Sequence, residues 1–105
     1  MKPVNTIRTP GYVYILTNKN KTVLYIGVTS DLRQRIWQHK NHFFKNSFAG
    51  RYNLERLIYI EECFDIESAI AREKVLKGWT RERKESLINS INPDWKDLSV
   101  TLLLE

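Results

Sequence analysis

Hydrophobic residues in the first part of the chain are gathered in short runs, and polar residues separate these runs. Residues 12–16 (YVYIL) and 22–28 (TVLYIGV) are aromatic and β-branched, a composition that favours strands. The polar stretch TNKNK between them is typical of a turn, so the two runs predict an antiparallel hairpin. A third run, at about residues 57–63, predicts another strand.

The hydrophobic period changes to three or four residues in later segments, which indicates amphipathic helices. The predicted helices cover residues 31–41, 66–78 and about 80–90. Their expected N-caps are Thr29 or Ser30, then Asp65, then Thr80. Gly78 is expected to end the second helix. Pro93 then interrupts regular structure, and the tail from residue 98 either packs onto the domain or extends the sheet.

The chain has 105 residues, which is the length of a single domain. Its elements predict a small α+β fold in which helices flank one antiparallel three-stranded sheet. We expect residues 1–10 to form a flexible arm, residues 11–98 the folded domain and residues 99–105 a C-terminal tail. Residues 41–53 (NHFFKNSFAGRYN) are irregular and rich in aromatics, so we expect a mobile loop that contacts substrate.

Basic residues exceed acidic ones, with 17 Lys and Arg against 12 Asp and Glu and a net charge of +5. The excess is concentrated in residues 33–56 and 72–84. Such patches attract polyanions, of which nucleic acid is the commonest, although a solvated, solubilising surface explains the charge equally well. The candidates for nucleic-acid contacts are Arg33, Lys40, Lys45, Arg51 and Lys77.

The single cysteine, Cys63, cannot form an internal disulfide. Its place at the end of a strand-like run favours a buried structural thiol over a reactive one. The N-terminus lacks the apolar core of a signal peptide. No segment has the roughly 20 apolar residues that a membrane span requires, so we expect a cytoplasmic protein.

A carboxylate interrupts the apolar positions of the second predicted helix. Glu73 falls at helical spacing from the apolar residues Ile66, Ala69, Ile70 and Leu76. A buried carboxylate is costly unless a cation, hydrogen-bond donors or a metal ion compensates its charge. Two interpretations stay open, an ion pair with a neighbour such as Lys77 and a metal site.

Four further residues are candidates for chemistry. Arg35 and His39 lie four residues apart on the first predicted helix, and therefore on one face. Tyr14 and Tyr25 lie on adjacent strands of the hairpin, so both can line one face of the sheet. Each residue has an ordinary explanation as a solvent-reaching arginine, a half-buried histidine or a core tyrosine. Together with Glu73 they also fit a phosphodiester site, with a metal ligand, a charged clamp and candidate bases.

The motif YVY at residues 12–14 is followed after ten residues by YIG at 25–27 and then by DLRQRIWQH at 31–39. This pattern resembles the GIY-YIG endonuclease superfamily. The segments AIAREKVLKGWTRERKESLI (69–88) and NPDWKDL (92–98) are similar to its small stand-alone, single-domain branch. The resemblance covers residues 11–98. The first motif departs from Gly-Ile-Tyr, and Val28 stands where some relatives carry a lysine.

The resemblance implies a metal-dependent endonuclease that hydrolyses phosphodiester bonds in nucleic acid, with DNA as the expected substrate. Glu73 would hold one Mg²⁺ or Mn²⁺ ion, and Arg35 would bind the phosphate through its fork of donors. The implied catalytic residues are Tyr14, Tyr25, Arg35, His39, Glu73 and Asn92, with Asn89 as a weaker match for the last of these.

The identity of the general base stays open. The resemblance favours Tyr14, then Tyr25, with His39 as the partner of Tyr14. A free tyrosine has a pKa near 10, which makes His39 the readier base at neutral pH. The alternative function is a catalytically silent nucleic-acid-binding module on the same fold.

Overall fold

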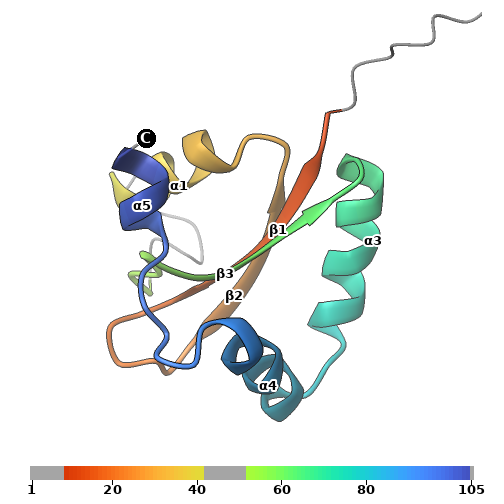
Figure 1. Cartoon of the computed structure of the whole chain (residues 1–105). Helices are drawn as coiled ribbons and strands as arrows, with labels where there is room; N and C mark the ends of the chain where they lie inside the picture. The colour runs from red at the N-terminus through yellow and green to blue at the C-terminus, as the bar shows by residue number, and fades with distance from the viewer. Residues whose placement is uncertain (1–8, 42–51, 105) are drawn as a thin grey trace, which may run out of the picture.

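The computed structural model describes residues 9–41 and 52–104 of the chain. The elements are β1 (Gly11–Thr17), β2 (Leu24–Thr29), α1 (Leu32–Lys40), β3 (Arg56–Cys63), α3 (Ile66–Lys77), α4 (Arg81–Ile91) and α5 (Ser99–Leu104). Helices flank a three-stranded antiparallel sheet (Figure 1), so the predicted α+β fold class is confirmed. Most of the predicted loop, including Lys45 and Arg51, lies outside the described residues.

Strand β1 is the centre of the sheet, whose order is β2-β1-β3. The hairpin register pairs Tyr14 with Gly27 and Leu16 with Tyr25. Because alternate residues of a strand point to opposite faces, the side chains of Tyr14 and Tyr25 lie on the same face. The hairpin prediction is therefore confirmed, together with the shared face of the two tyrosines.

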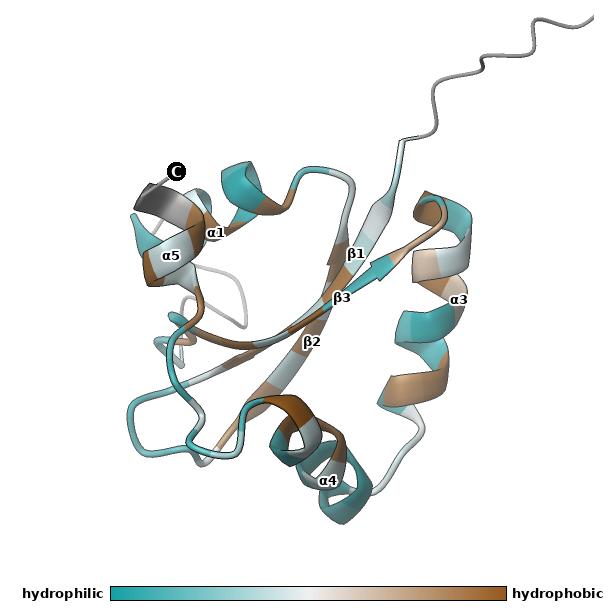
Figure 2. Cartoon of the chain, in the orientation of Figure 1, coloured by the Kyte–Doolittle hydropathy of each residue, from teal (hydrophilic) through white to brown (hydrophobic). Residues whose placement is uncertain are grey.

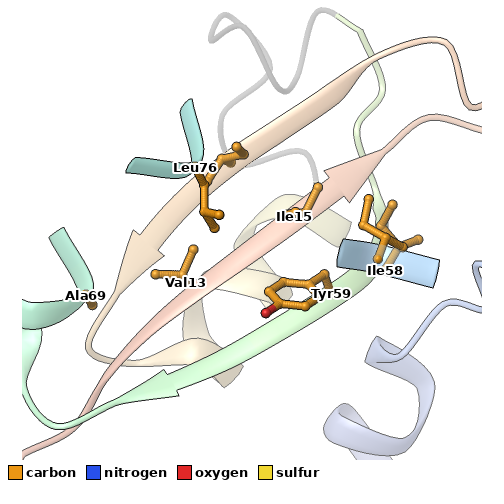
Figure 3. Packing of buried hydrophobic residues seen from close by; sticks show 8 residues of the cluster. Val13, Ile15, Ile58, Tyr59, Ala69 and Leu76 are labelled. Atoms are coloured by element: carbon orange, nitrogen blue, oxygen red, sulfur yellow. The ribbon is translucent and has the colours of Figure 1, made fainter. Parts of the chain in front are cut away.

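The two faces of β1 carry two separate hydrophobic clusters. Val13 and Ile15 pack with buried residues of α3 and α4 (Figure 3). Tyr14 and Leu16 pack on the opposite face, with residues of α1 and the C-terminal segment. Figure 2 shows hydrophobic residues along the strands and hydrophilic ones on the outer side of α4. The sheet thus separates the layer of α1 and α5 from the layer of α3 and α4.

The helix starts follow side-chain capping, with one correction to the prediction. Asp65 and Thr80 cap α3 and α4 as predicted. Asp31, and not Thr29 or Ser30, caps α1 by accepting a hydrogen bond from the Gln34 N–H at 3.1 Å. The Thr29 hydroxyl accepts the Asp31 N–H at 3.0 Å instead. It therefore stabilises the turn from β2 and leaves the cap to Asp31.

The C-terminal segment forms helix α5 against α1 and does not extend the sheet as a strand. The Asp97 carboxylate accepts hydrogen bonds from the Leu57 N–H at 3.2 Å, the Ser99 N–H at 3.0 Å and the Lys40 ammonium at 2.5 Å. Burial alone would raise the pKa of Asp97, but the bonds from Lys40, Ser99 and Leu57 hold it below its usual value. Asp97 thereby joins the end of α1, the start of β3 and the start of α5.

No helix among the described residues is long and apolar enough to span a membrane.

Cys63 is only partly buried, with its Sγ 4.0 Å from the Glu61 carboxylate. Burial, with a smaller effect of Glu61, raises the pKa of the thiol. A raised pKa disfavours the reactive thiolate, which agrees with a structural cysteine.

Candidate active site

The Tyr14 ring lies directly over Gly27 of the neighbouring strand. A Cβ atom at position 27 would lie 2.3 Å from Tyr14 Cζ and 2.4 Å from the hydroxyl oxygen. Real Cβ atoms do not approach other atoms so closely, so the ring can occupy this place only because residue 27 is glycine. The YIG motif thus supplies the space for the tyrosine of the preceding motif.

Helix α1 brings a histidine against both tyrosines. His39 is buried, and its ring centroid lies 6.2 Å from that of Tyr14 and 6.3 Å from that of Tyr25, both edge-to-face. Arg35, one turn earlier on α1, is half-buried and lies close enough to act on the charge states of Tyr14 and His39. The four residues predicted from the two motifs and the following helix therefore converge in space.

The Tyr14 hydroxyl is buried, and no described residue forms a hydrogen bond with it. Burial, and after it the neighbouring Tyr25, raises the pKa of Tyr14 to about 12, and Glu73 contributes to the same rise. Arg35 lowers this pKa, although its guanidinium does not reach the hydroxyl with hydrogen-bond geometry. The raised pKa favours the neutral phenol over the phenolate that would serve as a base.

His39 is shifted in the opposite direction. Burial, and after it the positive charge of Arg35, lowers the pKa of His39 to about 4. The imidazole is consequently neutral at pH 7 and can accept a proton. Of the two side chains, the histidine is the one whose protonation state suits a base.

Glu73 lies on α3, and its charge acts on the charge state of Tyr14. Its side chain is 15% exposed and lies 3.5 Å from the Lys77 ammonium, so the predicted ion pair exists. The predicted apolar stripe needs one correction, because Ile70 is 38% exposed while Ala69 and Leu76 are buried. Glu73 lies at the margin of the buried face, where its carboxylate is shielded and still accessible.

The described residues contain no group of three His, Cys, Asp or Glu side chains that could hold a metal ion. Mg²⁺ is commonly bound through only one or two carboxylates, with water and substrate phosphates as its other ligands. A shielded carboxylate such as Glu73 fits that kind of site, and the donor set fits an ion whose coordination the substrate completes.

The side chain of Asn92 forms hydrogen bonds with backbone groups of β3 and of the segment that follows α4. Its side-chain amide donates to the carbonyls of Ile58 and Lys96, both at 2.9 Å, and its Oδ1 accepts the Lys96 N–H at 3.0 Å. Asn89 accepts a hydrogen bond from the Trp95 indole at 2.6 Å. These bonds hold the segment after α4 in place, and they use both amide protons of Asn92.

Of the predicted nucleic-acid contacts that the structure describes, two lysines form ion pairs with carboxylates and one arginine is exposed. Lys40 is bonded to Asp97, and Lys77 is paired with Glu73. Arg33 is exposed beside a cavity of about 260 Å³, which Tyr12 also lines.

The sequence prediction missed two residues, Gly27 and Asp97. The position of Gly27 opposite Tyr14 in the hairpin could have revealed its role, whereas no local signal points to Asp97.

The chain is similar to known proteins in sequence and in structure. The family model of the GIY-YIG catalytic domain matches residues 10–86. A UPF0213 protein of Haloquadratum walsbyi is 35% identical over 77 residues, covering 72% of this chain and 83% of the relative. A UPF0213 protein of Clostridium perfringens is 38% identical over 79 residues, covering 75% of this chain and 83% of the relative.

A solved structure is similar as well. The solution NMR structure of a UPF0213 protein from Bacillus halodurans matches with a TM-score of 0.53 at 28% identity, over 84% of this chain and 92% of that one. Because the family model spans well over half of the sequence and includes both tyrosine motifs, the chain belongs to the GIY-YIG catalytic-domain family.

Proposed function

We propose that the protein is a metal-dependent endonuclease that hydrolyses phosphodiester bonds in nucleic acid, with DNA as the substrate. The observation that carries the proposal is the convergence of Tyr14, Tyr25, Arg35 and His39. Glu73 adds a shielded carboxylate whose charge acts on Tyr14. A site that only binds nucleic acid has no need of a shielded carboxylate whose charge acts on a buried phenol.

Arg35 and Glu73 have complementary roles in this proposal. Arg35 binds the scissile phosphate, because its planar fork of donors matches the phosphate oxygens. Glu73 holds one Mg²⁺ or Mn²⁺ ion through its carboxylate. When bound, such an ion would supply positive charge that stabilises the charge developing on the phosphate.

The protonation states favour His39 as the first proton acceptor. With a pKa of about 12, only about one Tyr14 side chain in 10⁵ is ionised at pH 7. Forming the phenolate at this pH therefore costs a free energy of about 7 kcal/mol. The neutral imidazole accepts the proton of the attacking water, either directly or through a tyrosine hydroxyl. The water oxygen then bonds to phosphorus, the bond from phosphorus to the 3′ oxygen breaks, and that oxygen takes up a proton from solvent water.

The test is cleavage of labelled single-stranded and duplex DNA and RNA by the isolated chain, with Mg²⁺ or Mn²⁺ and with EDTA. We expect metal-dependent cleavage by the wild type and none by Glu73→Gln, which keeps the shape of the side chain. Binding of the same substrates, measured with EDTA present, serves as the control for folding. Wild-type protein that binds nucleic acid but never cleaves it would establish the silent binding module instead.

A further inference from the structure

Lys77 is the polar partner of Glu73 among the residues that the structure describes. The two residues are one turn apart on α3, and the Lys77 ammonium lies 3.5 Å from Glu73 Oε2. A carboxylate that is largely removed from water needs a compensating charge. In the free protein Lys77 supplies that charge, at the position where Glu73 would bind a metal ion.

The two partners differ strongly in exposure. The side chain of Glu73 is 15% exposed, whereas that of Lys77 is 56% exposed. An ion pair with one exposed partner is weak because solvent screens it and the long lysine loses rotamer freedom. The carboxylate is therefore fixed by its surroundings, while the lysine can swing away on its flexible stem.

We propose, building on the endonuclease function above, that Lys77 is a displaceable cation that serves two anions in turn. It neutralises Glu73 in the free protein and leaves the carboxylate when a divalent cation binds there. It then contacts a phosphate of the bound nucleic acid next to the scissile one. Its Glu73 contact makes it a competitor of the metal ion, and its phosphate contact makes it part of the substrate site.

Charge explains why the displaced lysine turns to the substrate. A divalent ion on Glu73 would repel an ammonium group only a few ångströms away. The nearest new anion is the phosphodiester that Arg35 and the ion bring to the site. The Lys77 side chain is 56% exposed and has a flexible stem, so we expect its ammonium group to turn toward a neighbouring phosphate.

Binding of Mn²⁺ to the free protein tests the first half of the proposal, by electron paramagnetic resonance without nucleic acid. Lys77→Met removes the competing charge, so Mn²⁺ should bind about two- to fivefold more tightly, as expected for loss of an exposed ion pair. Lys74→Met is the matched control. It removes the same charge from an exposed position of the same helix and should leave Mn²⁺ affinity near the wild-type value.

Single-turnover cleavage at saturating Mn²⁺ tests the second half. Lys77→Met should raise the nucleic-acid concentration needed for half-maximal rate, and should reduce the salt dependence of binding by about one phosphate contact. Lys77→Arg should retain most of the binding. If Lys77→Met and Lys74→Met have the same Mn²⁺ affinity and the same dependence of cleavage on nucleic-acid concentration, the proposed role of Lys77 is wrong, but the metal site at Glu73 is unaffected. Mn²⁺ binding that is absent in the wild type, or unchanged in Glu73→Gln, would overturn this role and the metal site together.

Discussion

Replacement of Gly27 by alanine is the sharpest test of the arrangement of the site. The new methyl group would lie 2.3 Å from Tyr14 Cζ, whereas ordinary contacts of a Cβ atom begin at 3.4 Å. The Tyr14 ring must therefore move by about 1 Å. Tyr14 is completely buried among the residues of its cluster, so this displacement is transmitted to a tightly packed core.

We expect Gly27→Ala to reduce both the stability of the protein and its rate of cleavage. Overpacking of a core by one carbon atom typically costs about 1–3 kcal/mol of unfolding free energy. In a domain of this size that lowers the melting temperature by roughly 4–8 °C for each kcal/mol. If Tyr14 and its neighbours form the catalytic site, a displacement of about 1 Å should also slow cleavage by about 10²-fold.

Thermal unfolding followed by circular dichroism and single-turnover cleavage measure the two effects. Gly78→Ala is the matched control, because its Cβ would come no closer than 3.4 Å to another atom and its φ of −79° suits alanine. In a Tyr14→Ala background, Gly27→Ala should lose most of its destabilising effect. A Gly27→Ala protein as stable and active as Gly78→Ala would show that the ring does not lie over residue 27.

Other predictions concern His39, Tyr14 and Asp97. Because the pKa of His39 is lowered to about 4 from 6.5, the unfolded chain binds more protons between these values; stability should rise with pH across that range, by up to about 3 kcal/mol. Urea unfolding at pH 4 to 7 should show a smaller rise in His39→Gln. If His39 is the base, cleavage should be constant from pH 6 to 8 and His39→Ala should lose about 10²–10⁴-fold, more than Tyr14→Phe; a rate that increases tenfold per pH unit would favour a phenolate. Tyr14→Phe removes a buried hydroxyl that lacks a hydrogen-bond partner among the described residues, so its melting temperature should rise, by an amount equivalent to about 1 kcal/mol. Asp97→Ala removes a charged hydrogen-bond acceptor shared by three elements and should lower the unfolding free energy by about 2–3 kcal/mol, whereas Asp94→Ala, at an exposed position, should have little effect.

Local sequence signals were sufficient for most of the fold. The aromatic and β-branched runs became the hairpin, and Asp65 and Thr80 became helix caps. The first cap was predicted wrongly because Thr29, Ser30 and Asp31 are all favourable capping residues, and only the turn geometry chooses among them. The conformation of the C-terminal tail cannot be predicted from the sequence for a related reason. Residues 99–104 (SVTLLL) have mixed propensities, and their packing against α1 decides for a helix.

Some features of the candidate site could also be predicted from the sequence, and others could not. Motif spacing was enough to bring Tyr14, Tyr25 and His39 together, because strand register and helix period determine their faces. The direction of their pKa shifts could not be predicted, since burial dominates both the rise for Tyr14 and the fall for His39. Burial depends on residues from the whole chain, and no pattern of spacing reports it.

The bonds of Asp97 bear on how a minimal version of this protein could be made. The GIY-YIG family model ends at residue 86, and a fragment trimmed there would still contain every one of Tyr14, Tyr25, Arg35, His39 and Glu73. It would lack the carboxylate that ties the last residue of α1 to β3, and with it the brace of the helix that carries Arg35 and His39. Such a fragment would hold all five proposed site residues but would lack this support for α1, so we expect the part of the chain needed for function to extend beyond residue 86.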